Sequence, residues 1–331
     1  MSHLPSILVL GCGSIGERHL RCFQKTGRVT VAGCDTNPTL RERIASTYGV
    51  PVFDDYAAAL KAQAWDGVVI CVPANLHTRC AMDALAAGAG VLIEKPLAIS
   101  MDGVDTLIEA AARSGRYCAV AYVFHVMPWM QAARDFLLSG ELGRALHLAL
   151  TAGQHFPTFR PAYREIYYTR HETGGGAIQD ALTHLINAVE WIVGPVTRIY
   201  CDASHQMLEG VTVEDTVNVS ARHGDVLASY AMTQFQAPSE VTLLIHAERG
   251  SLRVLGHKQT WSVMRHGEQE WTDHVIAPLE RDDLFIAQAN AYLDGLEGKP
   301  TPLSTIEEGA QTLRVNLAAL RSVSTALPIT L

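Results

Sequence analysis

Three side chains have types and spacings suited to moving a proton and stabilising a negative oxygen. Asp180 and His184 lie four residues apart in a segment with helical character, so both are expected on one helix face. A carboxylate beside an imidazole fixes its tautomer and raises its basicity, so His184 is the candidate to accept a hydroxyl proton. Lys95 follows an apolar run expected to be a parallel strand, where its ammonium can polarise an oxygen. The alternatives are a capping aspartate with a core histidine, and a solvated lysine.

A glycine-rich segment near the start of the chain has the pattern of a phosphate-binding loop. Gly11, Gly13 and Gly16 fit G-x-G-x-x-G between an apolar run and a helical segment. Gly11 allows the tight turn, Gly13 lets the backbone approach a pyrophosphate, and Gly16 lets helix and strand pack closely. Ser14 and Ile15 complete the loop at a helix N-terminus, where free N–H groups favour phosphate. The segment predicts a dinucleotide-binding site.

Asp35 bears on the choice between NAD and NADP. It ends the second β-rich run, where a carboxylate accepts hydrogen bonds from both ribose hydroxyls and repels a 2′-phosphate. Arg41 and Arg43 follow closely, but on a helix they are expected to face solvent. We therefore predict NAD rather than NADP. The alternative is a glycine-rich turn followed by a helix-capping aspartate.

Residues 153–173 form a long segment without periodicity, which inside a compact domain is usually functional. Arg160 and Arg164 can each hold a carboxylate or phosphate with two parallel hydrogen bonds. The aromatic residues of the segment can stack on a sugar ring or a base; they are Phe156, Phe159, Tyr163, Tyr167 and Tyr168. Our hypothesis is that this segment covers the substrate, and that Arg160 and Arg164 select a hydroxylated molecule with a negative group, such as a sugar acid or nucleotide sugar. The alternative is a surface loop with anchoring aromatics and solvated arginines.

The first third of the chain alternates short apolar runs with helical segments, which is typical of parallel strands joined by helices. Strands are expected at residues 7–11, 29–34, 67–72, 90–93 and 117–123. Helices are expected at residues 14–25, 40–48, 76–87 and 104–113. We predict an N-terminal Rossmann domain, a doubly wound parallel sheet that binds the dinucleotide, over residues 1–123.

The rhythm changes after residue 123. Helices are expected at residues 128–138, 177–193, 284–296 and 307–323, and strands at residues 145–152, 197–203, 216–222, 227–234 and 241–248. Only short turns separate the last four strands, which favours an antiparallel meander. Residues 124–331 are predicted to form an α/β domain for substrate binding and oligomerisation.

Three further motifs follow in order along the chain. They are Val72-Pro73-Ala74-Asn75-Leu76-His77, Glu94-Lys95-Pro96, and Gly174-Gly175-Gly176 with Asp180 and His184. Together with the glycine-rich loop, these motifs resemble the Gfo/Idh/MocA oxidoreductase family, the relatives of glucose–fructose oxidoreductase and inositol dehydrogenase. The resemblance covers residues 5–195 and continues more diffusely to the C-terminus.

The resemblance implies a Rossmann domain followed by an α/β domain with a large, open, mostly antiparallel sheet. It also implies NAD(P) on the first domain, substrate in the cleft between the domains, a cis Lys95–Pro96 peptide, and a reaction centre of Lys95, Asp180 and His184. On this basis the cofactor site is assigned to Lys95 together with Val72, Pro73, Asn75, His77 and Glu94. Tyr122 is assigned to the substrate site with Lys95, Asp180 and His184. For His77, packing at a helix start is the alternative.

The sequence departs from the family pattern at several positions, which leaves the substrate undetermined. Leu182 stands where glycine is usual, and Asn187 stands where aspartate is frequent. His125 lies in a segment that lacks the usual asparagine and arginine, and Ala74 replaces an asparagine.

Composition excludes several classes of protein. The net charge of −8 argues against a general nucleic-acid partner, and no apolar run approaches the length of a membrane span. The first residues are typical of a strand rather than a signal peptide. The seven cysteines are scattered, which argues against a disulfide framework and a metal site and favours the reducing cytoplasm.

The strands of the second half carry apolar residues that we expect on both alternating sets. They are Val217, Val219 and Ala221, with Leu227, Ala228, Tyr230 and Met232. One set can pack on the helix at 177–193, which would leave the other as an exposed apolar patch in a monomer. We therefore predict a homo-oligomer, a dimer or tetramer.

The leading hypothesis is an NAD-dependent dehydrogenase or reductase that acts on a secondary alcohol or ketone of a sugar-like or polyol substrate. One alternative keeps NAD bound and recycles it, so that transient oxidation activates the substrate for elimination or glycoside cleavage. The other is a dinucleotide-sensing regulator without catalysis, although a sensor has no need of Lys95, Asp180 and His184 together.

Overall fold

The computed structural model describes residues 4–331, which divide into two units. The first unit runs to Val126 and takes in Leu279–Ala310, and the second comprises Met127–Pro278 and Gln311–Leu331. The predicted boundary at residues 123 and 124 assigns all the later residues to the second domain, and here the structure differs. Residues 279–310 belong to the first unit because helix α9 (Arg281–Leu296) packs against α1 (Ser14–Lys25).

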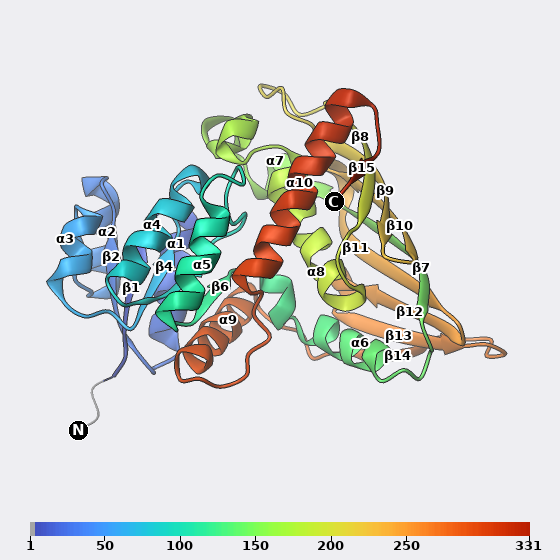
Figure 1. The fold of residues 1–331 in the computed structure, drawn as a ribbon, viewed down its shortest axis with the longest axis horizontal. Helices are drawn as coiled ribbons and strands as arrows, with labels where there is room; N and C mark the ends of the chain where they lie inside the picture. The colour runs from blue at the N-terminus through green and yellow to red at the C-terminus, as the bar shows by residue number, and fades with distance from the viewer. Residues whose placement is uncertain (1–3) are drawn as a thin grey trace. The chain divides into compact units, whose positions relative to one another are not determined.

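The first unit contains a six-stranded parallel sheet in the order β3-β2-β1-β4-β5-β6 (Figure 1). Its strands are β1 (Ser6–Leu10), β2 (Thr30–Cys34), β3 (Val52–Phe53), β4 (Gly67–Ile70), β5 (Gly90–Ile93) and β6 (Cys118–Val120). Besides α1 and α9, its helices are α2 (Pro38–Tyr48), α3 (Tyr56–Ala62), α4 (His77–Ala86) and α5 (Val104–Ser114). This order confirms the doubly wound Rossmann sheet. Chain order reverses between β1 and β4, which is where such sheets bind ligands.

Local sequence explains these elements. Strands β1, β4 and β5 are buried at every residue, and apart from Ser6 they consist of apolar residues and glycine. Helix α2 begins at an Asn37 cap followed by Pro38 and ends at Gly49, whose φ of 65° is in the left-handed region. Helices α4 and α5 pack together, as do α1 and α9.

The second unit contains a nine-stranded sheet in the order β14-β13-β12-β11-β7-β10-β9-β8-β15. Its strands are β7 (Ala145–His155), β8 (Arg198–Ser204), β9 (Thr216–His223), β10 (Val226–Thr233), β11 (Phe235–Ala247), β12 (Gly250–Leu255), β13 (Thr260–Arg265), β14 (Thr272–Val275) and β15 (Ile329–Thr330). The sheet is mostly antiparallel, as expected. The continuous meander is wrong, because β7 lies between β10 and β11 and pairs with β10 in parallel.

Helices α6 (Pro128–Leu138), α8 (Thr183–Val193) and α10 (Ile306–Thr325) lie on one side of this sheet (Figure 1). Burial alternates along the strands, and the apolar set is a single face. The residues buried on that face are Val217, Val219, Ala221, Ala228, Tyr230 and Met232. The expected second apolar set is wrong, because Asn218, Ser220 and Ser229 occupy the exposed positions beside Leu227.

Residues 153–173 are not structureless. Strand β7 continues to His155, and short helical turns follow at Phe156–Phe159, Tyr163–Glu165, Tyr167–Thr169 and His171–Thr173. They are held by a buried cluster of Phe156, Tyr163 and Tyr168 with Leu208, Val211 and Val213. The aromatic residues therefore anchor the segment to its unit.

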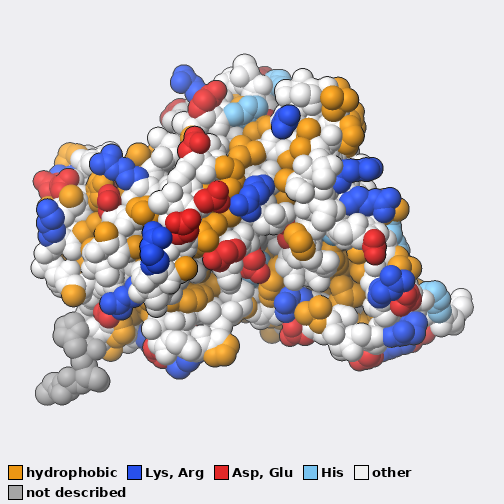
Figure 2. Space-filling view, viewed as in Figure 1, with side chains coloured by type: hydrophobic (Ala, Val, Ile, Leu, Met, Phe, Trp, Pro, Cys, Tyr) orange, Lys and Arg blue, Asp and Glu red, His pale blue; other side chains and the backbone are white. Residues whose placement is uncertain are grey.

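Surface features agree with ordinary globular packing. On the face drawn in Figure 2, acidic and basic side chains are interspersed. No helix within residues 4–331 is long and apolar enough to cross a membrane. All seven cysteines are free thiols.

Candidate functional site

The glycine-rich loop follows β1 and has the geometry that a dinucleotide needs. Gly11 has a φ of 89°, and a side chain there would meet the Cys71 carbonyl oxygen at 2.6 Å. A Cβ at Gly16 would lie 1.8 Å from the Gly11 carbonyl oxygen, so loop and helix are closely packed. At Gly13 a Cβ would meet nothing within 4 Å, and α1 begins there without a side-chain cap. The open backbone and the N-terminus of α1 therefore fit a pyrophosphate.

Asp35 supports the same loop from the end of β2. Its Oδ2 accepts the Cys12 N–H at 2.7 Å, and its Oδ1 accepts the Asn37 N–H at 2.8 Å. Arg41 donates to the Asp35 carbonyl oxygen at 2.8 Å rather than only facing solvent as expected. Arg43 pairs with Glu17 at 2.7 Å. A single carboxylate thus fixes the loop and lies where a ribose is expected.

Two loops follow the neighbouring strands β4 and β5, and His77 joins them. Its Nδ1 lies 2.9 Å from the Pro96 carbonyl oxygen and its Nε2 lies 2.8 Å from the Val72 carbonyl oxygen. His77 is buried, and this burial lowers the pKa of its imidazole. These contacts match the alternative of helix-start packing. The expected cis peptide at Lys95–Pro96 is confirmed.

A buried carboxylate connects α1 with the segment that bears Lys95. The Nε2 of His19, on α1, lies 2.7 Å from Oε1 of Glu94, and both side chains are buried. The other Glu94 oxygen accepts the backbone N–H of Lys95 at 3.1 Å. Glu94 therefore positions the backbone of Lys95. Its contact with the cofactor stays a prediction.

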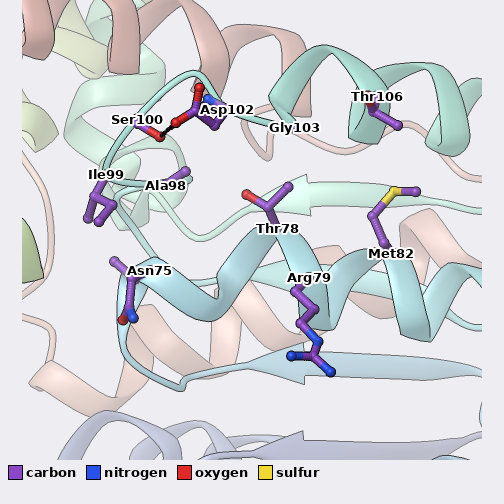
Figure 3. A pocket seen from close by; sticks show the side chains of 11 residues that line it. Asn75, Thr78, Arg79, Met82, Ala98, Ile99, Ser100, Asp102, Gly103 and Thr106 are labelled. Carbon is purple, nitrogen blue, oxygen red and sulfur yellow. Dashed lines mark hydrogen bonds between the residues drawn. The ribbon is translucent and has the colours of Figure 1, made fainter.

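Asn75 opens onto a cavity of about 410 Å³ between α4 and residues 98–103 (Figure 3). The Ser100 hydroxyl donates to Asp102 at 3.0 Å on the opposite wall. Thr78 and Arg79 line the cavity from α4. Met82 of α4 and Thr106 of α5 also line the cavity, which therefore lies between these two helices.

In the second unit, Asp180 lies in a π-helix, Ile178–Leu182, that leads into α8. The sequence predicts an ordinary helix there. π-helices occur mostly as single turns, frequently at functional sites. A step of four residues in a π-helix is slightly less than a full turn, so Asp180 and His184 stay on nearly the same face of the helix. The Tyr167 hydroxyl donates to Asp180 Oδ1 at 2.6 Å. Asp180 is 9% exposed.

Glu214 holds the start of this π-helix. Its Oε1 accepts the Ile178 N–H at 2.9 Å, and its Oε2 lies 2.6 Å from Nε2 of His171. A side chain at Gly176, where φ is 87°, would meet the Glu214 carboxylate at 2.6 Å. The glycine run therefore makes room for the buried Glu214 carboxylate at the start of the π-helix.

The predicted substrate residues lie in different surroundings. Arg164 donates to the Glu209 carbonyl oxygen at 2.8 Å and pairs with its carboxylate at 3.2 Å, whereas Arg160 forms no ion pair among the residues described here. Tyr122 is fully buried at the end of β6. Their contact with substrate stays a prediction.

Sequence reasoning missed His19, Tyr167 and Glu214 as site-supporting residues. The signal for His19 is its place three residues after Gly16, on the helix of the phosphate loop. No pattern pairs Tyr167 with Asp180, because 13 residues and a sharp change of direction separate them. Two departures from the family's sequence pattern also have a structural explanation. Leu182 fills the core, and Asn187 donates to Thr312 of α10 at 3.1 Å.

Residues 6–122 match the family model described as an oxidoreductase family with an NAD-binding Rossmann fold, and residues 130–253 match the GFO/IDH/MocA C-terminal domain. Inositol 2-dehydrogenase of Pseudomonas syringae pv. syringae is 31% identical over 320 residues, covering 88% of this chain and 85% of that protein. The 1,5-anhydro-D-fructose reductase of Ensifer adhaerens is 26% identical over 78% of each chain. Inositol 2-dehydrogenase of Streptomyces avermitilis is 30% identical over 59% of this chain, and the match spans about half, 54%, of that relative.

Two solved structures share the fold over nearly the whole chain. Levoglucosan dehydrogenase in complex with NADH and levoglucosan has a TM-score of 0.87 at 18% identity, with 99% of both chains covered. The WlbA dehydrogenase from Bordetella pertussis, in complex with NADH and UDP-GlcNAcA, has a TM-score of 0.85 at 24% identity, again with 99% of both chains covered. With its two matched domains and its phosphate loop, the chain belongs to the Gfo/Idh/MocA family of NAD-binding oxidoreductases.

Proposed function

We propose that this chain transfers a hydride between NAD and a secondary alcohol or ketone of a sugar-like or polyol substrate. The observation that carries the proposal is the placement of Lys95. It follows β5, two strands from the phosphate loop of β1, and its backbone is held by Glu94. An ammonium beside a dinucleotide site can stabilise an oxygen whose carbon exchanges hydride.

The residues have distinct roles in the proposed reaction. Bound NAD supplies the hydride acceptor, or as NADH the donor. His184 takes the hydroxyl proton, Asp180 fixes its tautomer and orientation, and Lys95 stabilises the developing alkoxide. In the reductive direction His184 returns the proton.

Relatives support a hydroxylated substrate without naming it. The curated relatives are named for inositol and 1,5-anhydro-D-fructose, and one structural neighbour holds a nucleotide sugar acid. We propose Arg160 as the first candidate to bind an anionic group, with Arg164 second because Glu209 already holds it. Equal loss of activity on acidic and neutral substrates in Arg160→Ala would contradict this assignment.

We also propose a homo-oligomer in the cytoplasm. Free thiols at all seven cysteines suit a reducing compartment. One face of the nine-stranded sheet carries small polar side chains together with exposed Tyr200 and Leu227, and this open face supports self-association.

The test is a screen of NAD⁺ reduction across polyols, sugars, sugar acids and nucleotide sugars. NADH should accumulate in equal amount with the oxidised product, whereas product without NADH would favour the recycling alternative. In Lys95→Ala and His184→Ala we expect kcat to fall ~10²-fold or more. NADH binding, measured by fluorescence titration, should persist in both. Near-normal turnover in either variant would refute the role of that residue.

A further inference from the structure

Tyr167 contacts the side chain on which the proposed proton transfer depends. Its hydroxyl donates to Oδ1 of Asp180 at 2.6 Å, a length typical of a hydroxyl bonded to a carboxylate. We propose that Tyr167 is a positioning residue that fixes the Asp180 carboxylate, and through it His184, for proton transfer. The inference rests on the proposed function.

The carboxylate needs such a donor because of where it lies. Asp180 is 9% exposed, and a nearly buried carboxylate is strongly disfavoured unless hydrogen bonds hold it. Its backbone N–H bonds to the Gly176 carbonyl oxygen. The backbone therefore fixes the start of the side chain, and Tyr167 fixes the direction of one carboxylate oxygen.

The turn that carries Tyr167 is held by contacts other than this hydroxyl. Its neighbour Tyr168 is fully buried and packs against Phe156, with ring centroids 4.5 Å apart and the ring planes tilted by 40°. The Thr173 hydroxyl donates to the Tyr167 carbonyl oxygen at 2.6 Å. Tyr167 itself is 44% exposed. Removing one hydroxyl should therefore leave the turn in place.

The neighbouring tyrosines use their hydroxyls differently and so provide controls. Tyr163 donates to the Glu209 carbonyl oxygen at 2.7 Å, and Tyr168 donates to Gln234. Both belong to the buried cluster that anchors the segment. Tyr163→Phe thus removes a structural hydrogen bond in the same segment without touching Asp180.

The kinetic test is a double-mutant cycle on kcat with Tyr167→Phe and Asp180→Asn. Tyr167→Phe should lower kcat about tenfold, the scale of one hydrogen bond to a charged group, with the KM for NAD⁺ and the Tm unchanged. In the Asp180→Asn background it should cause no further loss, because residues that act as a unit are not additive. Tyr163→Phe should lower Tm and leave kcat within twofold. Unchanged kcat in Tyr167→Phe, or full additivity in the double variant, would overturn the proposal.

A spectroscopic measurement separates this inference from the proposed function. The chain has ten tyrosines, so labelling with [¹³Cζ]-tyrosine gives a small set of signals, and Tyr167→Phe assigns one of them. Asp180→Asn should move the Tyr167 signal and leave the Tyr163 signal in place. If the wild type turns over no candidate substrate, the proposed function fails. The Tyr167 signal still shows in that case whether Tyr167 contacts Asp180. A Tyr167 signal that stays fixed in Asp180→Asn overturns it.

Discussion

At the scale of single residues, Asp35 has two functions that substitution can separate. Its carboxylate accepts the Cys12 N–H within the phosphate loop, and we predict that its charge opposes a 2′-phosphate. An asparagine keeps an oxygen for the Cys12 amide and removes the charge. An alanine removes both.

We therefore predict different outcomes for the two substitutions. Wild type should bind NADH at least about tenfold more tightly than NADPH, and Asp35→Asn should reduce that preference chiefly by improving NADPH binding. Asp35→Ala should also weaken NADH about tenfold, because the Cys12 N–H and the ribose both lose their acceptor. Fluorescence titrations of both cofactors measure these values. A wild type that prefers NADPH tenfold would refute the assignment.

At the scale of elements, the π-helix depends on a carboxylate from a distant strand connection. Glu214 accepts the Ile178 N–H and also lies beside His171, which belongs to the turns before the glycine run. The hydrogen bond to Glu214 raises the pKa of His171 above its ordinary 6.5. One carboxylate thus joins the segment that carries Tyr167 to the helix that carries Asp180.

This raised pKa predicts a stability that depends on pH. The His171–Glu214 contribution is fully present below pH 6.5 and is lost as pH rises through the raised pKa of the folded state. Because 44% of the His171 side chain is exposed, the effect is modest. Between pH 6 and pH 8.5, Tm should fall by about 1–2 °C more in wild type than in His171→Gln. Equal pH dependence in the two proteins, measured by thermal unfolding, would contradict it.

The elements also differ in how far the sequence predicts them. Strands β1, β4 and β5 are predictable because burial on both faces requires uninterrupted apolar runs. The sequence does not predict strands β12 and β13, since polar side chains such as Arg253 and Ser262 interrupt their apolar residues. The placement of β7 beside β10 joins residues about 80 apart, and no local pattern encodes such a pairing.

Some parts of the candidate site are likewise predictable from the sequence, and others are not. Gly11, Gly13 and Gly16 are predictable because each glycine has a separate steric reason. In the structure, a side chain at Gly11 or Gly16 would meet neighbouring backbone, and the space at Gly13 is open. The π-helix is not predictable, because one widened turn leaves the apolar pattern of the helix intact. The Tyr167–Asp180 contact depends on the path of the turns between them, which tertiary packing of the aromatic cluster sets.

At the scale of the whole molecule, the nine-stranded sheet has one face that no helix of its own unit covers. Its exposed positions carry small polar residues such as Ser220 and Ser229, with Tyr200 41% and Leu227 46% exposed. Nine strands spaced ~4.8 Å apart and on average about seven residues long span on the order of 1,000 Å². That area exceeds the ~800 Å² per partner of a standard stable interface. Small side chains also let a second flat surface approach closely.

We therefore predict that wild type has at least twice the monomer mass in light scattering at micromolar concentration. The double variant Tyr200→Asp/Leu227→Asp should shift toward monomer, because each substitution would bury an unpartnered carboxylate against the second copy. Val275→Asp is the matched control, since Val275 is 74% exposed but lies on the edge strand β14, five strands from β10 and seven from β8. It should leave the mass unchanged. A wild-type monomer would contradict the prediction. If Val275→Asp dissociates the oligomer and Tyr200→Asp/Leu227→Asp leaves it intact, the interface lies at the β14 edge instead.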